Sequence, residues 1–71
     1  MDIDKLSRMA NQIAANFEAN GHDKAVEDTA THILKFWDPR MKAQIFADDL
    51  SRLSPIASQA VEKLKADAEA A

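Results

Sequence analysis

Few side chains in this sequence could perform acid–base or metal chemistry, because its 71 residues include two His and no Cys. Asp28 and His32 are the best-placed pair, since residues four apart share one face of a helix. A structural zinc site needs four ligands and a catalytic one usually takes three from the protein, and no third ligand stands nearby in the sequence. We therefore interpret the pair as a contact on a helix surface and predict no metal site. His22 stands beside Asp23 in a predicted connection, where we expect it to be solvated.

Nucleophilic catalysis also lacks the residues that it needs. The candidate nucleophiles are hydroxyls, and none has a His in a recognisable motif: Ser7, Ser51, Ser54 and Ser58. A single Gly excludes a Gly-rich loop that binds phosphate. So short a chain also encloses a ligand pocket of roughly 300–1,000 Å³ only with difficulty. We predict that the chain is not an enzyme by itself and that it has no catalytic residue and no cofactor of its own.

Length and composition indicate one small helical domain, residues 1–71, that depends on a partner. A core of this size gives marginal stability, and the usual aids are disulfides, a metal or a partner surface. The absence of Cys removes disulfides and thiolate metal sites. No apolar run approaches the roughly 18 residues that span a bilayer, and the acidic residues 1–4 lack the pattern of a signal peptide. We expect a cytoplasmic protein without membrane contact.

The charge pattern argues against nucleic acid as a partner. The net charge is −3, and it is uneven: residues 32–42 carry +2, from Lys35, Arg40 and Lys42 against Asp38, which leaves −5 on the rest. A small helix–turn–helix regulator built around Asp38-Pro39 is an alternative. Three cations contribute little counterion-linked affinity for DNA, however, and the acidic remainder opposes approach. We expect no nucleic-acid partner.

Apolar residues recur at helical spacing in four segments, which predicts an all-α fold, a small bundle of four short helices joined by tight turns. The inner face of the first helix is predicted to hold Leu6, Met9, Ala10, Ile13, Ala14 and Phe17. That of the second, from about residue 24 to 36 or 37, is predicted to hold Val26, Thr29, Ala30, Ile33, Leu34 and Trp37. That of the fourth, from Pro55 to about Asp67, is predicted to hold Ala57, Ala60, Val61, Leu64 and Ala68.

The caps follow from local chemistry. Asp2 or Asp4 can cap the first helix, Asn20-Gly21 can end it, and Asp23 can cap the second. Asp38-Pro39 and Ser54-Pro55 each combine an N-cap residue with a Pro at the first helical position.

The third helix is predicted to turn Ala43, Phe46, Ala47, Leu50 and Leu53 toward the core. Met41 and Ile45 then lie one turn apart on its opposite side. An apolar pair outside the core is either surface scatter or a contact surface. Trp37 falls near the middle of an apolar face, so we interpret it as a core residue, although large aromatic residues also anchor interfaces.

Residues 31–42, Thr-His-Ile-Leu-Lys-Phe-Trp-Asp-Pro-Arg-Met-Lys, resemble the signature of the delta subunit of NAD-dependent, molybdenum-containing formate dehydrogenases. Residues 8–13, Arg-Met-Ala-Asn-Gln-Ile, are similar to the start of that family, and Leu53-Ser54-Pro55 and Ala60-Val61 are similar to its last helix. The chain departs from the family in two places. Residues 48–52 contain no Gly where relatives often have one, and Phe17 stands where relatives often have two aromatics.

The resemblance implies a non-catalytic accessory subunit that binds the catalytic alpha subunit within a larger hetero-oligomer and supports its assembly, stability or activity. Partner subunits would carry bis-molybdopterin guanine dinucleotide, iron–sulfur clusters and FMN, and would pass electrons from formate to NAD. A transient assembly chaperone for the molybdenum-containing subunit is the alternative. The predicted partner interface consists of Lys35, Trp37, Asp38, Pro39, Arg40, Met41, Lys42 and Ile45.

Overall fold

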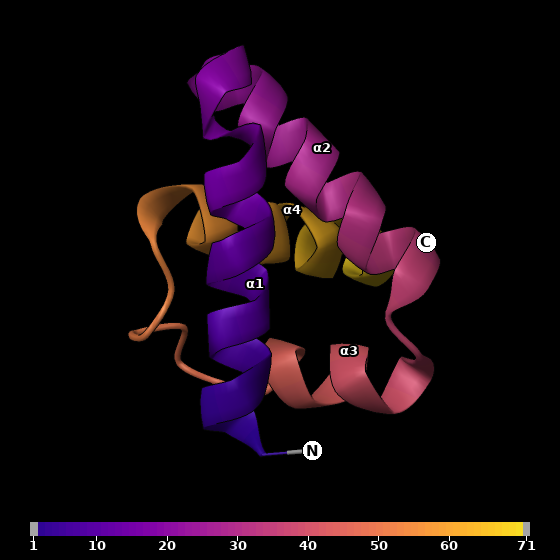
Figure 1. Cartoon of the computed structure of the whole chain (residues 1–71). Coiled ribbons are helices and arrows are strands. Elements are labelled where there is room, and N and C mark those ends of the chain that lie inside the picture. Colours follow the sequence, from indigo (N-terminus) through magenta and orange to yellow (C-terminus); the bar gives the residue numbers. More distant parts are fainter. Residues whose placement is uncertain (1, 71) are drawn as a thin grey trace.

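The computed structural model describes residues 2–70, and these form four α-helices and no strand (Figure 1). The helices are α1 (Ile3–Phe17), which continues into the short 3-10 helix η1 (Glu18–Asn20), α2 (His22–Phe36), α3 (Pro39–Phe46) and α4 (Pro55–Ala70). The all-α prediction is therefore confirmed. Met1 and Ala71, which belong to the predicted domain, lie outside the described residues.

The helices are arranged as a hairpin crossed by two further helices. α1 and α2 lie side by side and join through η1, while α4 passes behind both and α3 lies across the other end, near the start of α1 (Figure 1). The long connection between α3 and α4 runs along the outer side of α1 (Figure 1). This arrangement brings the α2–α3 corner close to the later turns of α4.

Three predicted caps are confirmed by their hydrogen bonds. The carboxylates of Asp2 and Asp38 accept from the amides of Lys5 at 2.8 Å and Met41 at 2.9 Å. The Ser54 hydroxyl accepts from the amide of Ala57 at 3.3 Å. The predicted start of the second helix is corrected, because α2 begins at His22 with Gly21 as its N-cap. Gly21 has a φ of +96°, a conformation that a residue without a Cβ adopts readily.

The core is built largely from alanine, which lets the helices approach closely. The buried cluster consists of Leu6, Ala10, Ala14, Ala30, Ile33, Trp37, Ile45, Ala57, Ala60, Val61 and Leu64. Trp37 is 5% exposed, so its placement in the core is confirmed. Ser7 is also buried, at 2% exposed, although it does not belong to the predicted inner face of the first helix.

Ile45 corrects the predicted orientation of the third helix. Its side chain is fully buried, and Met41 packs half-buried against the same core, whereas the alanines predicted to face inward are exposed: Ala43 and Ala47. The prediction extends one helical wheel through Leu53, but α3 ends at Phe46. When only residues 39–46 are placed on the helical wheel, the inner face of α3 is the one that carries Met41 and Ile45, which lie one turn apart.

Leu34 corrects the predicted inner face of the second helix. It is 57% exposed, whereas Ile33 beside it is fully buried. The buried line of α2 runs through Ala25, Thr29 and Ile33, and each step of one residue rotates a side chain by about 100°. Leu34 therefore lies at the margin of the face that the other helices cover.

Candidate partner-binding surface

The α2–α3 corner is held on its inner side by three contacts. The amide of Trp37 donates to the carbonyl of Ile33 at 3.1 Å, and the Trp37 side chain is in the core. Trp37 and Asp38 are extended, with ψ of 137° and 167°, so the chain changes direction there. Asp38 then caps α3, and Pro39 occupies the first turn where a missing N–H costs nothing. The corner is thus a rigid platform.

The residues of the predicted interface separate into three groups. Two are buried in this fold, Trp37 and Ile45. Two are half-buried, Met41 and Lys42. The remaining four are exposed and free to contact a partner: Lys35, Asp38, Pro39 and Arg40. The role of these eight residues in a partner interface stays a prediction.

An apolar groove that the sequence did not predict opens beside this corner. Its volume is about 430 Å³, and it is lined by Leu34, Pro39, Lys42, Ala43, Phe46, Leu64, Asp67 and Ala68. Lys42 crosses between two of the helices, because its Nζ donates to the carbonyl oxygen of Leu34 at 3.3 Å. That carbonyl belongs to the last turn of α2, where helix carbonyls have no partner within the helix. We call this feature the α2–α4 groove.

The signal for the groove was present in the sequence as a surplus of apolar residues. Leu34 and Ala68 both belong to predicted inner faces, yet the fold leaves them exposed. Phe36, 71% exposed, stacks against the His32 ring with centroids 4.8 Å apart but does not line the groove. Large apolar side chains gathered on one part of a surface mark contact sites.

The cations of the corner form no ion pair within residues 2–70. The ion pairs within residues 2–70 join Lys24 to Asp28 at 3.7 Å and Arg52 to Asp4 and Asp48 at 2.9 and 3.9 Å. None of them involves the three cations of the corner, which are Lys35, Arg40 and Lys42. The one acidic residue among them, Asp38, is engaged as a helix cap. The local positive charge is therefore available to an outside group.

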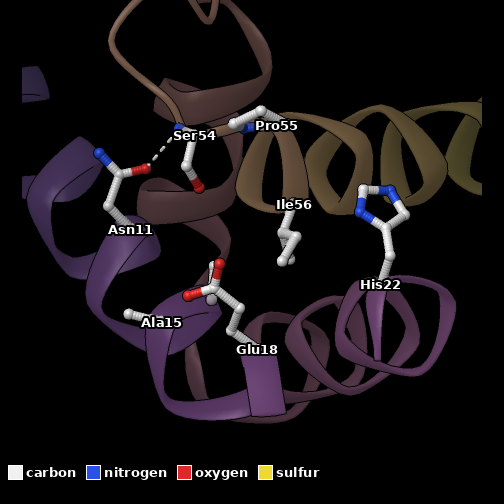
Figure 2. Close-up of a pocket in the computed structure, with 8 residues that line it drawn as sticks. Asn11, Ala15, Glu18, His22, Ser54, Pro55 and Ile56 are labelled. Atoms are coloured by element: carbon white, nitrogen blue, oxygen red, sulfur yellow. Dashed lines mark hydrogen bonds between the residues drawn. The ribbon is translucent and has the colours of Figure 1, made fainter. Parts of the chain in front are cut away.

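The second hollow of the surface, of about 240 Å³, offers less chemistry (Figure 2). His22 stands at its edge as the first residue of α2, and its Nε2 lies 3.0 Å from the Gln59 side-chain oxygen in α4. Glu18 and Ser54 also line it, and the Ser54 hydroxyl accepts the amide of Ala57. This arrangement ties α2 to α4 and contains no nucleophile next to the imidazole.

The pair that looked most like a metal site is used differently. Asp28 forms its ion pair with Lys24, which lies one helical turn before it, whereas His32 lies one turn after it. Within residues 2–70, no three His or carboxylate side chains gather as metal ligands would.

None of the helices within residues 2–70 combines the length and the apolar character needed to cross a bilayer.

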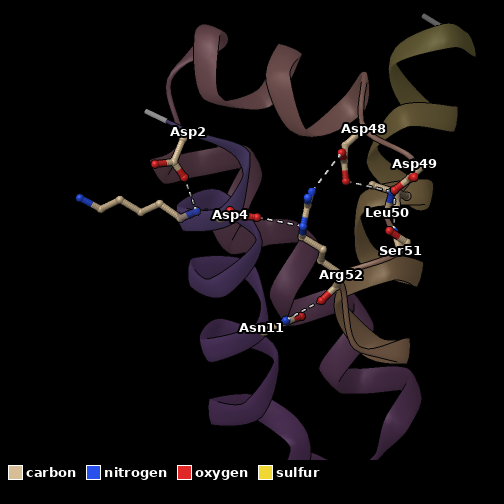
Figure 3. A network of polar contacts seen from close by, with 9 residues as sticks. Asp2, Asp4, Asn11, Asp48, Asp49, Leu50, Ser51 and Arg52 are labelled. Atoms are coloured by element: carbon tan, nitrogen blue, oxygen red, sulfur yellow. Dashed lines mark hydrogen bonds and ion pairs between the residues drawn. The ribbon is translucent and has the colours of Figure 1, made fainter.

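A polar network joins α1 to the connection that precedes α4 (Figure 3). The Asn11 side chain donates to the carbonyl of Arg52 at 3.0 Å and accepts the amide of Ser54 at 2.8 Å. Arg52 reaches back to Asp4 through its Nε at 2.9 Å. Residues 8–13 and 53–55, far apart in the sequence, are thus in direct contact. We call this contact the Asn11 junction.

Residues 5–61 match the model of a protein family described as the NADH-dependent formate dehydrogenase delta subunit, FdsD. The chain belongs to this family. The matched residues include the Asn11 junction, the α2–α3 corner and the start of α4, so the match to FdsD covers both the junction and the corner. No curated protein and no solved structure matches the chain. The α4 wall of the groove, residues 64–68, lies beyond the part that matches FdsD.

Proposed function

We propose that this delta subunit is a non-catalytic accessory subunit that binds the catalytic alpha subunit of a cytoplasmic, NAD-dependent molybdenum formate dehydrogenase. The observation that carries the proposal is the family match over residues 5–61. Its name assigns the family to a formate dehydrogenase.

The exposed half of the α2–α3 corner supports partner binding as the mode of action. It presents Arg40 and Lys35 without internal ion pairs, beside the α2–α4 groove. A domain of this size gains stability when a partner covers such a surface, because binding to the folded state alone shifts the folding equilibrium. The molybdopterin, iron–sulfur and FMN groups would all be bound by the partner subunits in this proposal.

Affinity purification of a tagged chain from cells that produce the whole enzyme tests the proposal. The expected result is a complex with the large molybdopterin-containing subunit in a fixed ratio. Failure to recover that subunit would overturn the proposal. Recovery only from cells in which the enzyme is still maturing would instead identify a transient assembly chaperone.

A second measurement separates assembly from tuning of activity. The enzyme produced with and without this chain is compared for molybdenum, pterin and formate-dependent reduction of NAD. An assembly role predicts that molybdenum and pterin content fall together with activity. A role in tuning predicts full metal and pterin content with altered turnover.

A further inference from the structure

The occupant of the α2–α4 groove can be inferred from its lining and its margin. This inference rests on the proposed function, since it names the part of the partner that the delta subunit would bind. We propose that the groove binds an amphipathic helix of the catalytic subunit, with apolar residues on one face and acidic residues beside it. The apolar face enters the groove, and the acidic residues meet the cations of the corner.

The lining of the groove favours side chains over a polar ligand. Its apolar lining includes Leu34, Phe46 and Leu64, and only Lys42 and Asp67 among its lining residues are charged. A groove between helices takes an amphipathic helix, whose residues at spacings of three and four fill one apolar trough. An extended strand would need an exposed sheet edge for its backbone hydrogen bonds, and the described residues form no sheet.

Charge complementarity supplies the acidic character of the occupant. Lys42 lines the groove, while Lys35 and Arg40 are the chain neighbours of its lining residues Leu34 and Pro39. These three cations have no ion pair within residues 2–70, although the chain as a whole carries −3. Rim charges of one sign select a partner of the opposite sign and accelerate association. Asp67 lies on the α4 wall, so the acidic residues of the occupant belong on the α3 side.

A second copy of the chain fits the groove less well. A two-fold symmetric dimer places the same patch of both chains face to face. Two concave surfaces leave each other unfilled, and the cations of both corners would be brought together. Self-association therefore enters the test as a competing outcome.

Thiol crosslinking tests the occupant directly, because the chain contains no Cys of its own. A single thiol is placed on either wall of the groove by Ala43→Cys or Ala68→Cys, both at exposed positions. Ala19→Cys, in η1 at the opposite end of the molecule, is the control (Figure 1). Each variant is co-produced with the whole formate dehydrogenase, labelled at its single thiol with a short photoreactive crosslinker that inserts into whatever chain lies beside it, illuminated, and mapped by peptide mass spectrometry.

The expected result is that both wall positions crosslink to one acidic, helical segment of the catalytic subunit and that the control does not. Crosslinks between two copies of this chain would overturn the inference in favour of a dimer. Crosslinks to the catalytic subunit from the control alone would overturn the groove and leave the proposed function standing. Absence of the catalytic subunit from every preparation would overturn both.

A pair of matched substitutions tests the energetics of the same site. Leu34→Asp places a charge in the groove, and Phe36→Asp places it on a similarly exposed apolar residue outside the groove. We expect Leu34→Asp to weaken the complex by about 30-fold or more, as for a central interface residue, and Phe36→Asp to weaken it much less. Arg40→Glu should slow association, with an effect that shrinks as salt is added. Equal weakening by both apolar substitutions, or no effect of salt, would contradict the proposed occupant.

Discussion

The Asn11 junction and the α2–α3 corner both lie in segments that match the family, yet they use their residues in different ways. At the junction, both polar atoms of the Asn11 side chain are bonded to backbone groups of the same chain. At the corner, Trp37 and Asp38 are used internally, whereas Leu34 and Arg40 are left facing solvent. A motif whose groups all bond internally is explained by folding. In a motif with exposed, unpaired groups, folding does not explain why those groups are present.

The largest effect is expected at the internal half of the corner. Trp37→Ala should lower stability by about 3–5 kcal/mol, because it removes a large side chain from the core. A domain of this length has a total stability of about 4–10 kcal/mol, so the variant should lose roughly half of it and unfold at a clearly lower temperature. Thermal unfolding followed by circular dichroism measures the change.

Phe36→Ala is the matched control for Trp37, since it removes a neighbouring aromatic that is 71% exposed. Its stability should change by about 0.5 kcal/mol or less. Similar losses of stability in the two variants would contradict the division of the corner into an internal and an external half.

The next largest effect is expected at the junction. Asn11→Ala leaves the part-buried amide of Ser54 and the exposed carbonyl of Arg52 without their partner. The cost should be about 1–3 kcal/mol, which is typical when partly buried polar groups lose their hydrogen bonds. Chemical denaturation measures it, and Asn16→Ala, which removes only a contact with Gln12 on the helix surface, is the control.

If the comparison holds, Asn11→Ala should weaken the complex with the catalytic subunit only through lost folding. Binding measured at a temperature where the variant is fully folded should therefore equal that of the native chain. A large loss of binding under that condition would show that the Asn11 junction belongs to the partner interface.

The helix caps could be predicted from the sequence, whereas the α2–α4 groove could not. Asp2, Asp38 and Ser54 were predicted as caps because a cap depends only on neighbours within three or four residues. The orientation of α3 depends on where that helix ends, and eight residues are too few for the apolar pattern to reveal it. Leu34 and Ala68 line the groove only because α2, α3 and α4 meet there, which is a tertiary property.

Leu50 provides a smaller test in the connection that the junction holds. Its φ of +65° lies in the left-handed region, and the amide of Leu50 donates to Asp48 at 3.0 Å. A residue without a Cβ avoids the strain of that conformation. Leu50→Ala and Leu50→Gly both remove the half-buried side chain, so the difference between them reports the backbone alone.

We expect Leu50→Gly to be more stable than Leu50→Ala by about 1 kcal/mol, from denaturant midpoints of the two variants. The order is the reverse of that in a helix, where Ala is preferred over Gly. If Leu50→Ala is instead the more stable variant, the connection relaxes out of the left-handed conformation.

The smallest effect is expected from Asp49, whose carboxylate accepts the amide of Ser51 at 3.0 Å (Figure 3). The backbone hydrogen bond from Ser51, followed by the Ser51 hydroxyl and the charge of Arg52, lowers the pKa of Asp49 below its usual value. The folded chain therefore holds this proton less tightly than the unfolded chain. The resulting stability is present above the unfolded pKa of about 4 and is lost as the pH falls through the lower folded value.

Asp49→Asn should therefore flatten the acid side of the stability profile below about pH 4 and lower stability slightly at neutral pH, because the charge-dependent part is lost although the amide oxygen still accepts from Ser51. Ser51→Ala retains the backbone donor and should remove only part of the slope. Urea unfolding at a series of pH values measures both variants. An unchanged acid slope in Asp49→Asn would mean that the turn opens before Asp49 is protonated, and that the Asn11 junction, rather than this turn, holds the connection in place.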